Sequence, residues 1–250
     1  MEVGIKLWST NPLEYVESAG FADFVEVMPV DAESLEKFTG RPYSYTVHVP
    51  HESFGFNPAL DPKKSHELLE QGIAAAKKLK GSRLIMHASH FYKQPDERAV
   101  HKAIAMTAKL AKEARFQGLL IENSTVHEVV NDHTRHYIGY SYEHMKELLE
   151  LSGAGFCMDL EHVAIAASQL GITFQKHANE LLRLKPDYFH LSGATLSDFT
   201  PKGHHLSLFE GDVDKDFAKS VIKKANKPVC LETPIDISQR KREVEFLKKC

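Results

Sequence analysis

The chain has 250 residues, of which 42% are apolar and 26% are charged, and its formal net charge is −3. This size and composition are those of an ordinary soluble protein built as one domain over residues 1–250. No apolar run approaches the ~20 residues that cross a bilayer, so no membrane partner is expected. The slight acidic surplus gives no support to nucleic acid as a partner, because binding to a polyanion usually requires a basic surface.

Short apolar runs alternate with longer amphipathic segments along the whole chain, a pattern typical of βαβ units. The predicted strands are 3–8, 23–28, 44–49, 83–87, 119–122, 155–159, 188–191 and 229–232. The predicted helices are 12–19, 32–38, 62–80, 96–116, 142–151, 174–184, 216–225 and 238–249, with a short extra helix at 162–170. Eight strands, each followed by a helix, predict a single (β/α)₈ TIM barrel. An open doubly wound sheet is the weaker alternative, because no Gly-rich phosphate loop follows the first strand.

The cysteines and the first residues of the chain indicate the compartment. Cys157, Cys230 and Cys250 show no metal-motif spacing, and the first two lie in apolar runs. Free thiols of this kind are typical of a reducing cytosol. Residues 1–10 lack the basic and long apolar regions of a secretion signal. A cytoplasmic location is therefore expected.

Potential ligands lie at the carboxyl ends of the predicted strands. From the third strand to the eighth, each strand places histidine, aspartate or glutamate at or beside this end: His48, His51, His87, His90, Glu122, Asp159, His162, His190 and Glu232. Closure of a barrel brings these ends together. Several buried carboxylates at one place repel one another unless a cation neutralises them. The sequence therefore predicts a divalent-metal site at this end of the barrel, beside the long loops 50–61, 123–141 and 192–214.

The ligand types narrow the choice of metal. Imidazole and carboxylate without thiolate suit Zn²⁺ or Mn²⁺ better than Fe²⁺ or Mg²⁺. One ion would be held by Glu122, Asp159, His190 and Glu232. A second would be held by His51 and His87 with Glu122 as the bridge, and a third by His162 with His205 or His204. We therefore expect two zinc ions, or three if the last set is complete, with Mn²⁺ or another divalent metal as the alternative.

Seven short segments resemble the xylose isomerase-like barrel superfamily, and within it most closely the endonuclease IV (AP endonuclease family 2) branch: PHESFGFNPA, LIMHASH, LIENS, CMDLEH, FHLSG, HHLSLFEG and LETP. They follow the family's order from the third strand to the eighth. The resemblance implies metal ligation by His51, His87, Glu122, Asp159, His162, His190, His205 and Glu232. It also implies three zinc ions that cleave the phosphodiester beside an abasic site through a metal-activated hydroxide.

The chain departs from this branch at three places. The family has an aspartate two residues before the histidine of the penultimate loop, whereas this chain has Gly203 before His205. Phe54-Gly55 stands where a bulkier pair is expected to enter the DNA duplex. The segment FADFVEVMP with Glu26, and the segment EGDVD, are more similar to the sugar isomerase and epimerase branches.

Three functions compete. The first is a metal-dependent phosphoester hydrolase with two or more ions, acting on a substrate other than ordinary abasic DNA. The second is an isomerase or epimerase of a small sugar or sugar acid, in which Glu122 and Glu232 move a proton beside one Mn²⁺-like ion. The third is a barrel that only binds metal or a metabolite. The sequence favours the hydrolase, with Glu122 and Glu232 as catalytic residues, and leaves the oligomeric state open.

Overall fold

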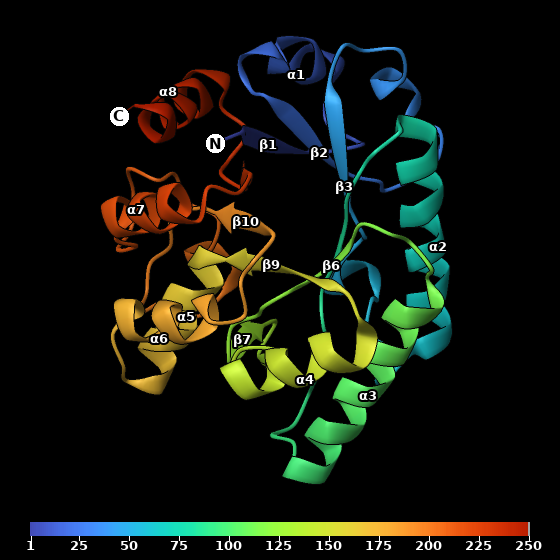
Figure 1. Ribbon diagram of the computed structural model, residues 1–250, viewed down its shortest axis with the longest axis vertical. Coiled ribbons are helices and arrows are strands. Elements are labelled where there is room, and N and C mark those ends of the chain that lie inside the picture. The colour runs from blue at the N-terminus through green and yellow to red at the C-terminus, as the bar shows by residue number, and fades with distance from the viewer. Residues whose placement is uncertain (250) are drawn as a thin grey trace.

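A computed structural model describes residues 1–249, and in it eight parallel strands close into a barrel (Figure 1). The barrel strands are β1 (Val3–Trp8), β2 (Phe24–Met28), β3 (Ser44–His48), β4 (Leu84–Met86), β6 (Leu119–Glu122), β9 (Gly155–Asp159), β10 (Tyr188–Leu191) and β11 (Val229–Leu231). Strand β1 pairs with both β2 and β11, which closes the sheet. The predicted (β/α)₈ barrel is therefore confirmed.

Helices surround the barrel on its outer face (Figure 1). They are α1 (Leu13–Glu17), α2 (Pro62–Leu79), α3 (Glu97–Glu113), α4 (Tyr142–Ser152), α5 (Leu160–Leu170), α6 (Phe174–Leu182), α7 (Lys215–Ala225) and α8 (Ile237–Lys248). The side chains of Asp61, Asp96 and Ser141 begin α2, α3 and α4 by accepting a hydrogen bond from a backbone N–H of the first turn. Within residues 1–249, no helix is both long and apolar enough to cross a lipid bilayer.

The helix predicted at 32–38 is wrong, because this segment forms turns and a single 3₁₀ turn, η2 (Glu36–Phe38). The Asp31 side chain accepts a hydrogen bond from the backbone N–H of Ser34 at 2.7 Å, which stabilises a turn in place of a helix. The Ser34 hydroxyl also donates to the Ser9 hydroxyl at 2.6 Å. Leu35 and Phe38 are buried, so their spacing reflects core packing without a continuous helix.

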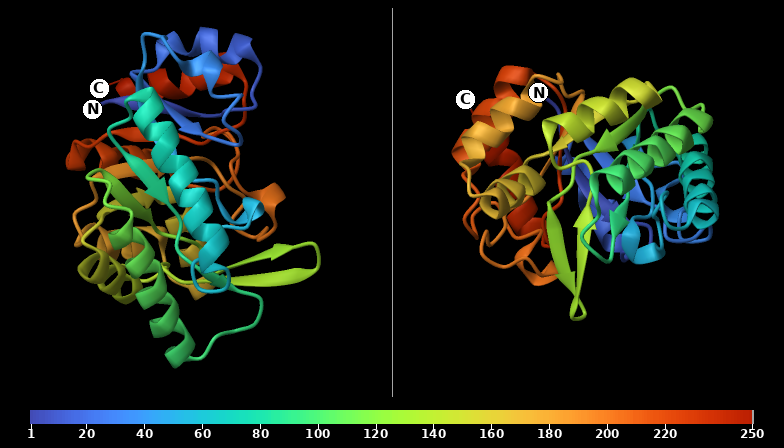
Figure 2. Two further views of the ribbon diagram at one scale, coloured as in Figure 1. Left: turned by 90° about the vertical axis from the view of Figure 1, so that its right-hand side faces the viewer. Right: turned by 90° about the horizontal axis from the view of Figure 1, so that it is seen from below.

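The connection 123–141, predicted to be a long loop, contains a β-hairpin. Strands β7 (His127–Val130) and β8 (His133–Tyr137) pair with each other, and β8 also pairs with the short strand β5 (His90–Phe91). At the tip, Asn131 and Asp132 have positive φ angles of 48° and 63°, as expected of a tight hairpin turn. Figure 2 shows the hairpin projecting from the body of the barrel.

Side chains inside the barrel form two layers. Every second residue of a barrel strand points inward. The apolar layer is a buried cluster of six residues: Phe24, Ile85, Leu120, Cys157, Tyr188 and Cys230. Two residues farther along the same strands come six polar side chains at the carboxyl ends: Glu26, His87, Glu122, Asp159, His190 and Glu232. Cys157 and Cys230 are free thiols in the apolar layer, and Cys250 lies outside the described residues.

Both ends of the described chain are attached to Asp23, at the amino end of β2. One carboxylate oxygen of Asp23 accepts from the backbone N–H of Val3 at 2.8 Å, and the other accepts from Lys248 Nζ at 2.7 Å. The beginning of β1 and the end of α8 therefore lie at the amino end of the barrel, opposite the polar layer.

Candidate metal centre

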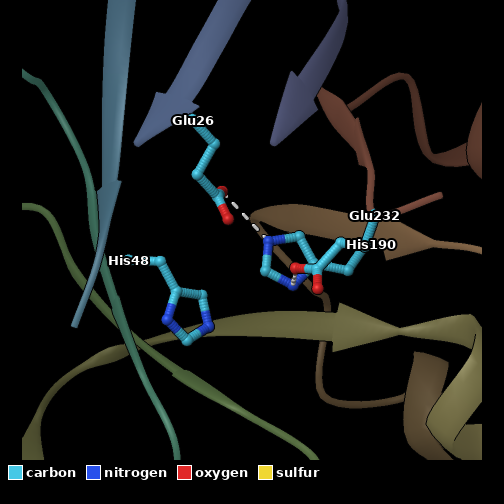
Figure 3. Close-up of side chains that lie close together, drawn as sticks. All are labelled: Glu26, His48, His190 and Glu232. Atoms are coloured by element: carbon cyan, nitrogen blue, oxygen red, sulfur yellow. Dashed lines mark hydrogen bonds and ion pairs between the residues drawn. The ribbon is translucent and has the colours of Figure 1, made fainter. Parts of the chain in front are cut away.

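His190 lies at the centre of the polar layer, between two carboxylates that approach from opposite sides (Figure 3). Its Nε2 lies 3.0 Å from Glu26 Oε2, and its Nδ1 lies 2.8 Å from Glu232 Oε1. Glu26 and His190 are fully buried. Burial opposes a charge on His190, but Cys157 and the carboxylates of Glu232 and Glu26 hold its pKa well above the usual range. The imidazole is thus hydrogen-bonded to Glu26 through Nε2, whereas its buried Nδ1 makes no hydrogen bond although Glu232 lies close to it.

Glu122, at the end of β6, directs its two oxygens toward different histidines. Its Oε1 lies 3.2 Å from His190 Nδ1 and 3.5 Å from His162 Nδ1. Its Oε2 lies 3.1 Å from His48 Nε2 and 3.2 Å from His87 Nε2. A carboxylate with a separate set of histidines on each oxygen has the geometry needed to bridge two cations.

Asp159 joins strand β9 to helix α5. Its Oδ1 accepts the hydrogen bond from the backbone N–H of His162 that begins α5, at 2.9 Å. Its Oδ2 is buried and has no hydrogen-bond partner. Burial, opposed by His162 and reinforced by Glu122, raises the pKa of Asp159 to about 6. A buried carboxylate oxygen without a partner is costly, and a cation beside it would remove that cost.

His51 and His87 both contact Glu52. His87 Nδ1 lies 2.9 Å from Glu52 Oε2, and His51 Nδ1 lies 3.7 Å from Glu52 Oε1. Burial lowers the pKa of His51 to about 3, so this imidazole is neutral. Burial also opposes a charge on His87, but Glu122 and Glu52 raise its pKa to about 10. The two histidines therefore differ in charge although their rings stack with centroids 5.9 Å apart.

Lys6 from β1 brings a positive charge into the polar layer. Its Nζ donates to Glu232 Oε1 at 2.8 Å and lies 3.8 Å from Glu26 Oε1. These carboxylates raise the pKa of the ammonium despite its burial. Lys6 also lines a cavity of about 340 Å³, together with His87, His162 and Glu232, and with Arg135 and Tyr137 of the hairpin. An anionic group entering this cavity would meet two cationic side chains.

His205, the last ligand expected from the sequence, lies apart from the central groups. Its side chain is 48% exposed, and its Nδ1 lies 3.2 Å from Glu161 Oε2 and 3.9 Å from Glu232 Oε2. The neighbouring His204 is more deeply buried, with Nδ1 3.4 Å from Glu161 Oε1. Gly203 has no side chain to offer, in agreement with the departure seen in the sequence.

The donor set fits divalent metal. Four groups bring their ligand atoms within 4.8 Å of one another: Glu26/His48/His190/Glu232, His48/His87/Glu122, Glu122/Cys157/His190 and Glu122/Asp159/His162. Six of the eight expected ligands belong to these groups, whereas His51 and His205 do not. Buried oxygens of Glu26 and Asp159 without hydrogen-bond partners add to the fit. Apart from Cys157, all donors in these groups are oxygen or imidazole, and such donors suit Zn²⁺ and Mn²⁺.

Five further residues of this centre were absent from the expected ligand set: Lys6, Glu26, His48, Glu52 and Glu161. A period-two pattern could have found the first three, because Lys6, Glu26 and His48 share the inward face of their strands. Lys6 and Glu26 interrupt apolar strands, and His48 ends β3. Nothing in the local sequence distinguishes Glu52 or Glu161 from surface glutamates, since tertiary contacts alone bring them to the histidines.

These features define a class of protein, a (β/α)₈ barrel with a histidine and carboxylate cluster at the carboxyl ends of its strands. Residues 13–250 match the sequence profile described as Xylose isomerase-like TIM barrel. The chain therefore belongs to that family.

The chain is similar in sequence to an endonuclease and similar in fold to several solved structures, an epimerase among them. The chain is 22% identical to "Probable endonuclease 4" of Mycobacterium bovis (strain BCG / Pasteur 1173P2) over an alignment of 262 residues. This alignment covers 100% of this chain and 98% of the relative. A Thermus thermophilus protein soaked with ZnCl₂ superposes with a TM-score of 0.70 at 20% identity, over 99% of this chain and 98% of that one. D-allulose 3-epimerase from Methylomonas sp. superposes with a TM-score of 0.69 at 16% identity, over 99% and 97%. At these identities the structural likeness concerns the fold.

Proposed function

We propose that the protein is a divalent-metal-dependent hydrolase that cleaves a small phosphoester. The observation that carries this proposal is the position of Glu122, whose two oxygens contact separate sets of histidines. Such a carboxylate is suited to join two cations, and paired cations are typical of phosphoester hydrolysis. Full-length similarity to "Probable endonuclease 4" supports the same reaction class.

Zinc is the proposed metal, with Mn²⁺ as the alternative. Glu122, Asp159, His190 and Glu232 would hold one ion, and His51 and His87 would hold a second with Glu122 between them. His48 also lies 3.1 Å from Glu122 Oε2 and would join the second group or orient its carboxylate. Bound divalent ions would supply Lewis-acid chemistry, activating water and stabilising the charge that develops on a phosphoester.

The protein's own side chains suit a small anionic substrate. Lys6 and Arg135 line the cavity and would bind phosphate oxygens, with Arg135 held 3.7 Å from Glu128. Glu232, between Lys6 and His190, would accept a proton at Oε1, and Glu122 would act with it as the second catalytic carboxylate. A cavity of about 340 Å³ lies at the small end of the range for metabolite sites. This volume and the net charge of −3 favour a small phosphoester over a DNA duplex.

A second candidate is a metal-dependent isomerase or epimerase of a small sugar or sugar acid. The observation in its favour is that Glu122 and Glu232 both contact His190 Nδ1, at 3.2 Å and 2.8 Å. Two carboxylates around one centre could remove and return a proton beside a carbonyl. Under this candidate a single ion would be bound, and His51 and His87 would contact the substrate.

Elemental analysis of the purified protein, combined with a substrate panel, separates the two candidates. We expect about two or more zinc ions per chain, and about one fewer in each of the variants His51→Ala and His87→Ala. Hydrolysis of bis(p-nitrophenyl) phosphate and of small phosphomonoesters is expected. One metal per chain that both variants retain, with proton exchange on a ketose and no hydrolysis, would replace the hydrolase by the isomerase. Incision of a duplex with one abasic site would overturn the small-substrate assignment.

A further inference from the structure

Arg240, near the start of helix α8, is a buried cation beside the cavity. The residue is only 2% exposed, and it lines the cavity together with Lys6, Glu232 and Pro234. Burying a charge is costly unless hydrogen bonds satisfy it. An apolar side chain would serve packing alone at a lower cost, so the hydrogen bonds of this guanidinium explain its presence.

All three nitrogen atoms of the guanidinium donate to backbone carbonyls at the mouth of the barrel. Nη1 donates to the carbonyl of Lys6 at 2.7 Å, and Nε donates to that of Pro234 at 3.1 Å. Nη2 donates to the carbonyl of Thr233. The first acceptor belongs to β1, and the other two belong to the segment directly after β11. One planar group therefore joins the carboxyl ends of two neighbouring strands.

The regular pairing of these two strands ends just before the residues that the proposed function uses. Strands β1 and β11 are paired as far as Ile5 and Leu231. Lys6 and Glu232 directly follow this last pair. Arg240 thus connects the two strand ends at the point where their pairing stops.

The contact between the Lys6 ammonium and the Glu232 carboxylate depends on this connection. Lys6 Nζ lies 2.8 Å from Glu232 Oε1, the oxygen that would accept a proton. The backbone N–H of Glu232 also donates to the carbonyl of Leu191 in β10 at 3.1 Å, so Glu232 is anchored without Arg240. A freed end of β1 would therefore move Lys6 away from an anchored carboxylate.

We infer that Arg240 is a positioning residue, which fixes the end of β1 and thereby holds the Lys6 ammonium against Glu232. The role belongs to the three directed hydrogen bonds of the guanidinium and not to its charge alone. The inference rests on the proposed function, in which Lys6 binds the substrate and Glu232 accepts a proton.

A double-mutant cycle tests whether Arg240 acts through Lys6. Arg240→Gln and Lys6→Met are each expected to lower kcat/KM for a hydrolysed phosphoester by about 10–100-fold, because small misplacements in a site are costly. In the Lys6→Met background, Arg240→Gln should cost less than about threefold more, because residues that act through one contact are not additive. Effects that multiply would show that Arg240 acts independently of Lys6 and would overturn the inference.

Arg240→Lys separates the charge from the hydrogen bonds. An ammonium keeps the positive charge but cannot donate to three carbonyls in the directions of a planar guanidinium. We expect Arg240→Lys to be nearly as impaired as Arg240→Gln. Recovery of kcat/KM to within about twofold of the unaltered protein would show that charge is sufficient and would overturn the positioning role.

Trp8 reports the position of β1 without any catalysis. It is the single tryptophan of the chain and lies two residues after Lys6, at the end of β1. Arg240→Gln should increase the quenching of its fluorescence by acrylamide, because a freed strand end is more accessible. Arg242→Gln is the matched control, since Arg242 is exposed on the same helix and its guanidinium lies over the Phe209 ring. Unchanged quenching in Arg240→Gln would contradict the connection to β1.

Glu243→Gln controls for a general loss of stability. Glu243 is a fully buried charge on the same helix, and it accepts from Ser207 Oγ at 2.8 Å and from Thr233 Oγ1 at 2.6 Å, both outside β1. Its variant is expected to melt at a lower temperature and to keep the normal quenching of Trp8. An equal increase in quenching would assign the effect to stability and reject the specific role of Arg240.

Side-chain NMR of the unaltered protein covers the case in which Arg240→Gln does not fold. The N–H groups of Arg240 should exchange with water at least about 10-fold more slowly than those of Arg242, because they are buried and bonded. Equally fast exchange would overturn the inference. If no phosphoester is hydrolysed, the proposed function fails, whereas Trp8 quenching and NMR still decide whether Arg240 holds the end of β1.

Discussion

Asn123 holds the ends of two strands and fixes a histidine at the same time. Its Oδ1 accepts from the backbone N–H of Asp159 at 2.8 Å, and its Nδ2 donates to the Asp159 carbonyl at 3.1 Å. The Asn123 carbonyl accepts from His162 Nδ1 at 2.8 Å. Because Nδ1 carries the proton, Nε2 of His162 is the nitrogen that remains for a metal. One residue therefore orients both members of the Asp159 and His162 pair.

Replacing Asn123 by alanine is expected to weaken folding and metal binding together. Two buried hydrogen bonds to Asp159 are lost, so the free energy of unfolding should fall by about 1–3 kcal/mol. Zinc affinity should fall by about 10–100-fold, because the ligands lose their orientation. Urea unfolding of metal-free protein and chelator competition measure the two effects. Asn179→Ala, at an exposed position of α6, is the control, and equal effects in both variants would contradict this role.

Metal affinity should rise with pH because His87 must lose a proton to become a ligand. Its pKa is raised from 6.5 to about 10, chiefly by Glu122 and Glu52 acting against burial, whereas that of His51 is about 3. At pH 7, binding at His87 therefore releases a proton, and the affinity should increase by up to about tenfold per pH unit. Calorimetry in buffers of different ionisation enthalpy counts the protons. Equal proton release in His87→Ala would contradict the assignment.

The raised pKa of His87 also affects the stability of the metal-free protein, which should fall as the pH rises. A raised folded-state pKa means that the charged His87 stabilises the fold fully below pH 6.5. This contribution is lost as the pH rises through about 10. The melting temperature of metal-free protein should therefore fall between pH 7 and 10, and less so in His87→Ala. A melting temperature that is constant over this range in both proteins would contradict the shift.

At the residue scale, strand-end patterning predicted which side chains meet in the polar layer but not the positive charge among them. Glu122, Asp159 and Glu232 could be picked out because each ends or directly follows an apolar strand, and His190 because it interrupts one. Lys6 was not in the predicted set, and its inward position in the first strand could not have shown which carboxylates it contacts. Its contact with Glu232 joins residues 226 positions apart.

The β7–β8 hairpin is the element that forms one wall of the cavity. Arg135 and Tyr137 line the cavity, and the Tyr137 hydroxyl donates to Glu128 Oε2 at 2.8 Å. Pairing of β8 with β5 attaches the hairpin to the segment after β4. The sequence did not reveal these strands because HEVV and HTRHY are polar and only partly buried.

Strain at the hairpin tip should affect substrate binding more than folding. Asn131 has a φ of 48°, which valine tolerates poorly and glycine adopts freely. Asn131→Val is therefore expected to destabilise the hairpin by about 1–2 kcal/mol, with faster amide exchange over 127–137 and a higher KM. Asn131→Gly is the matched control with near-normal values. If the two variants have the same exchange rates and KM, the hairpin does not shape the cavity.

At residues 32–38 the spacing of apolar residues predicted a helix that the structure does not contain. Leu35 and Phe38 are spaced like one face of a helix, and both are buried. The Asp31 and Ser34 side chains nevertheless bond locally and to Ser9, which favours turns over a helical segment of only a few residues. Longer helices such as α2 and α3 were predictable because they have both a cap and an extended apolar face.

For the whole molecule, metal should add stability without being required for the fold. The large apolar core between strands and helices is separate from the polar layer, so metal-free protein should keep its helical circular dichroism. Zinc at about 100 times its Kd should raise the free energy of unfolding by about 2.7 kcal/mol per site. Calorimetric scans with zinc and with chelator measure the difference. Complete unfolding on chelation would show that the barrel depends on its metal.

The attachment of both chain ends to Asp23 has a practical consequence. Val3 and Lys248, near the two ends of the described chain, lie at the amino side of the barrel, and the candidate ligands lie at the carboxyl side. A fusion partner, an affinity tag or a sensor surface attached at either end would therefore leave the mouth of the cavity facing solution. Immobilised protein is thus suited to repeated cycles of stripping and reloading with different ions, while the entry of substrate is followed in real time.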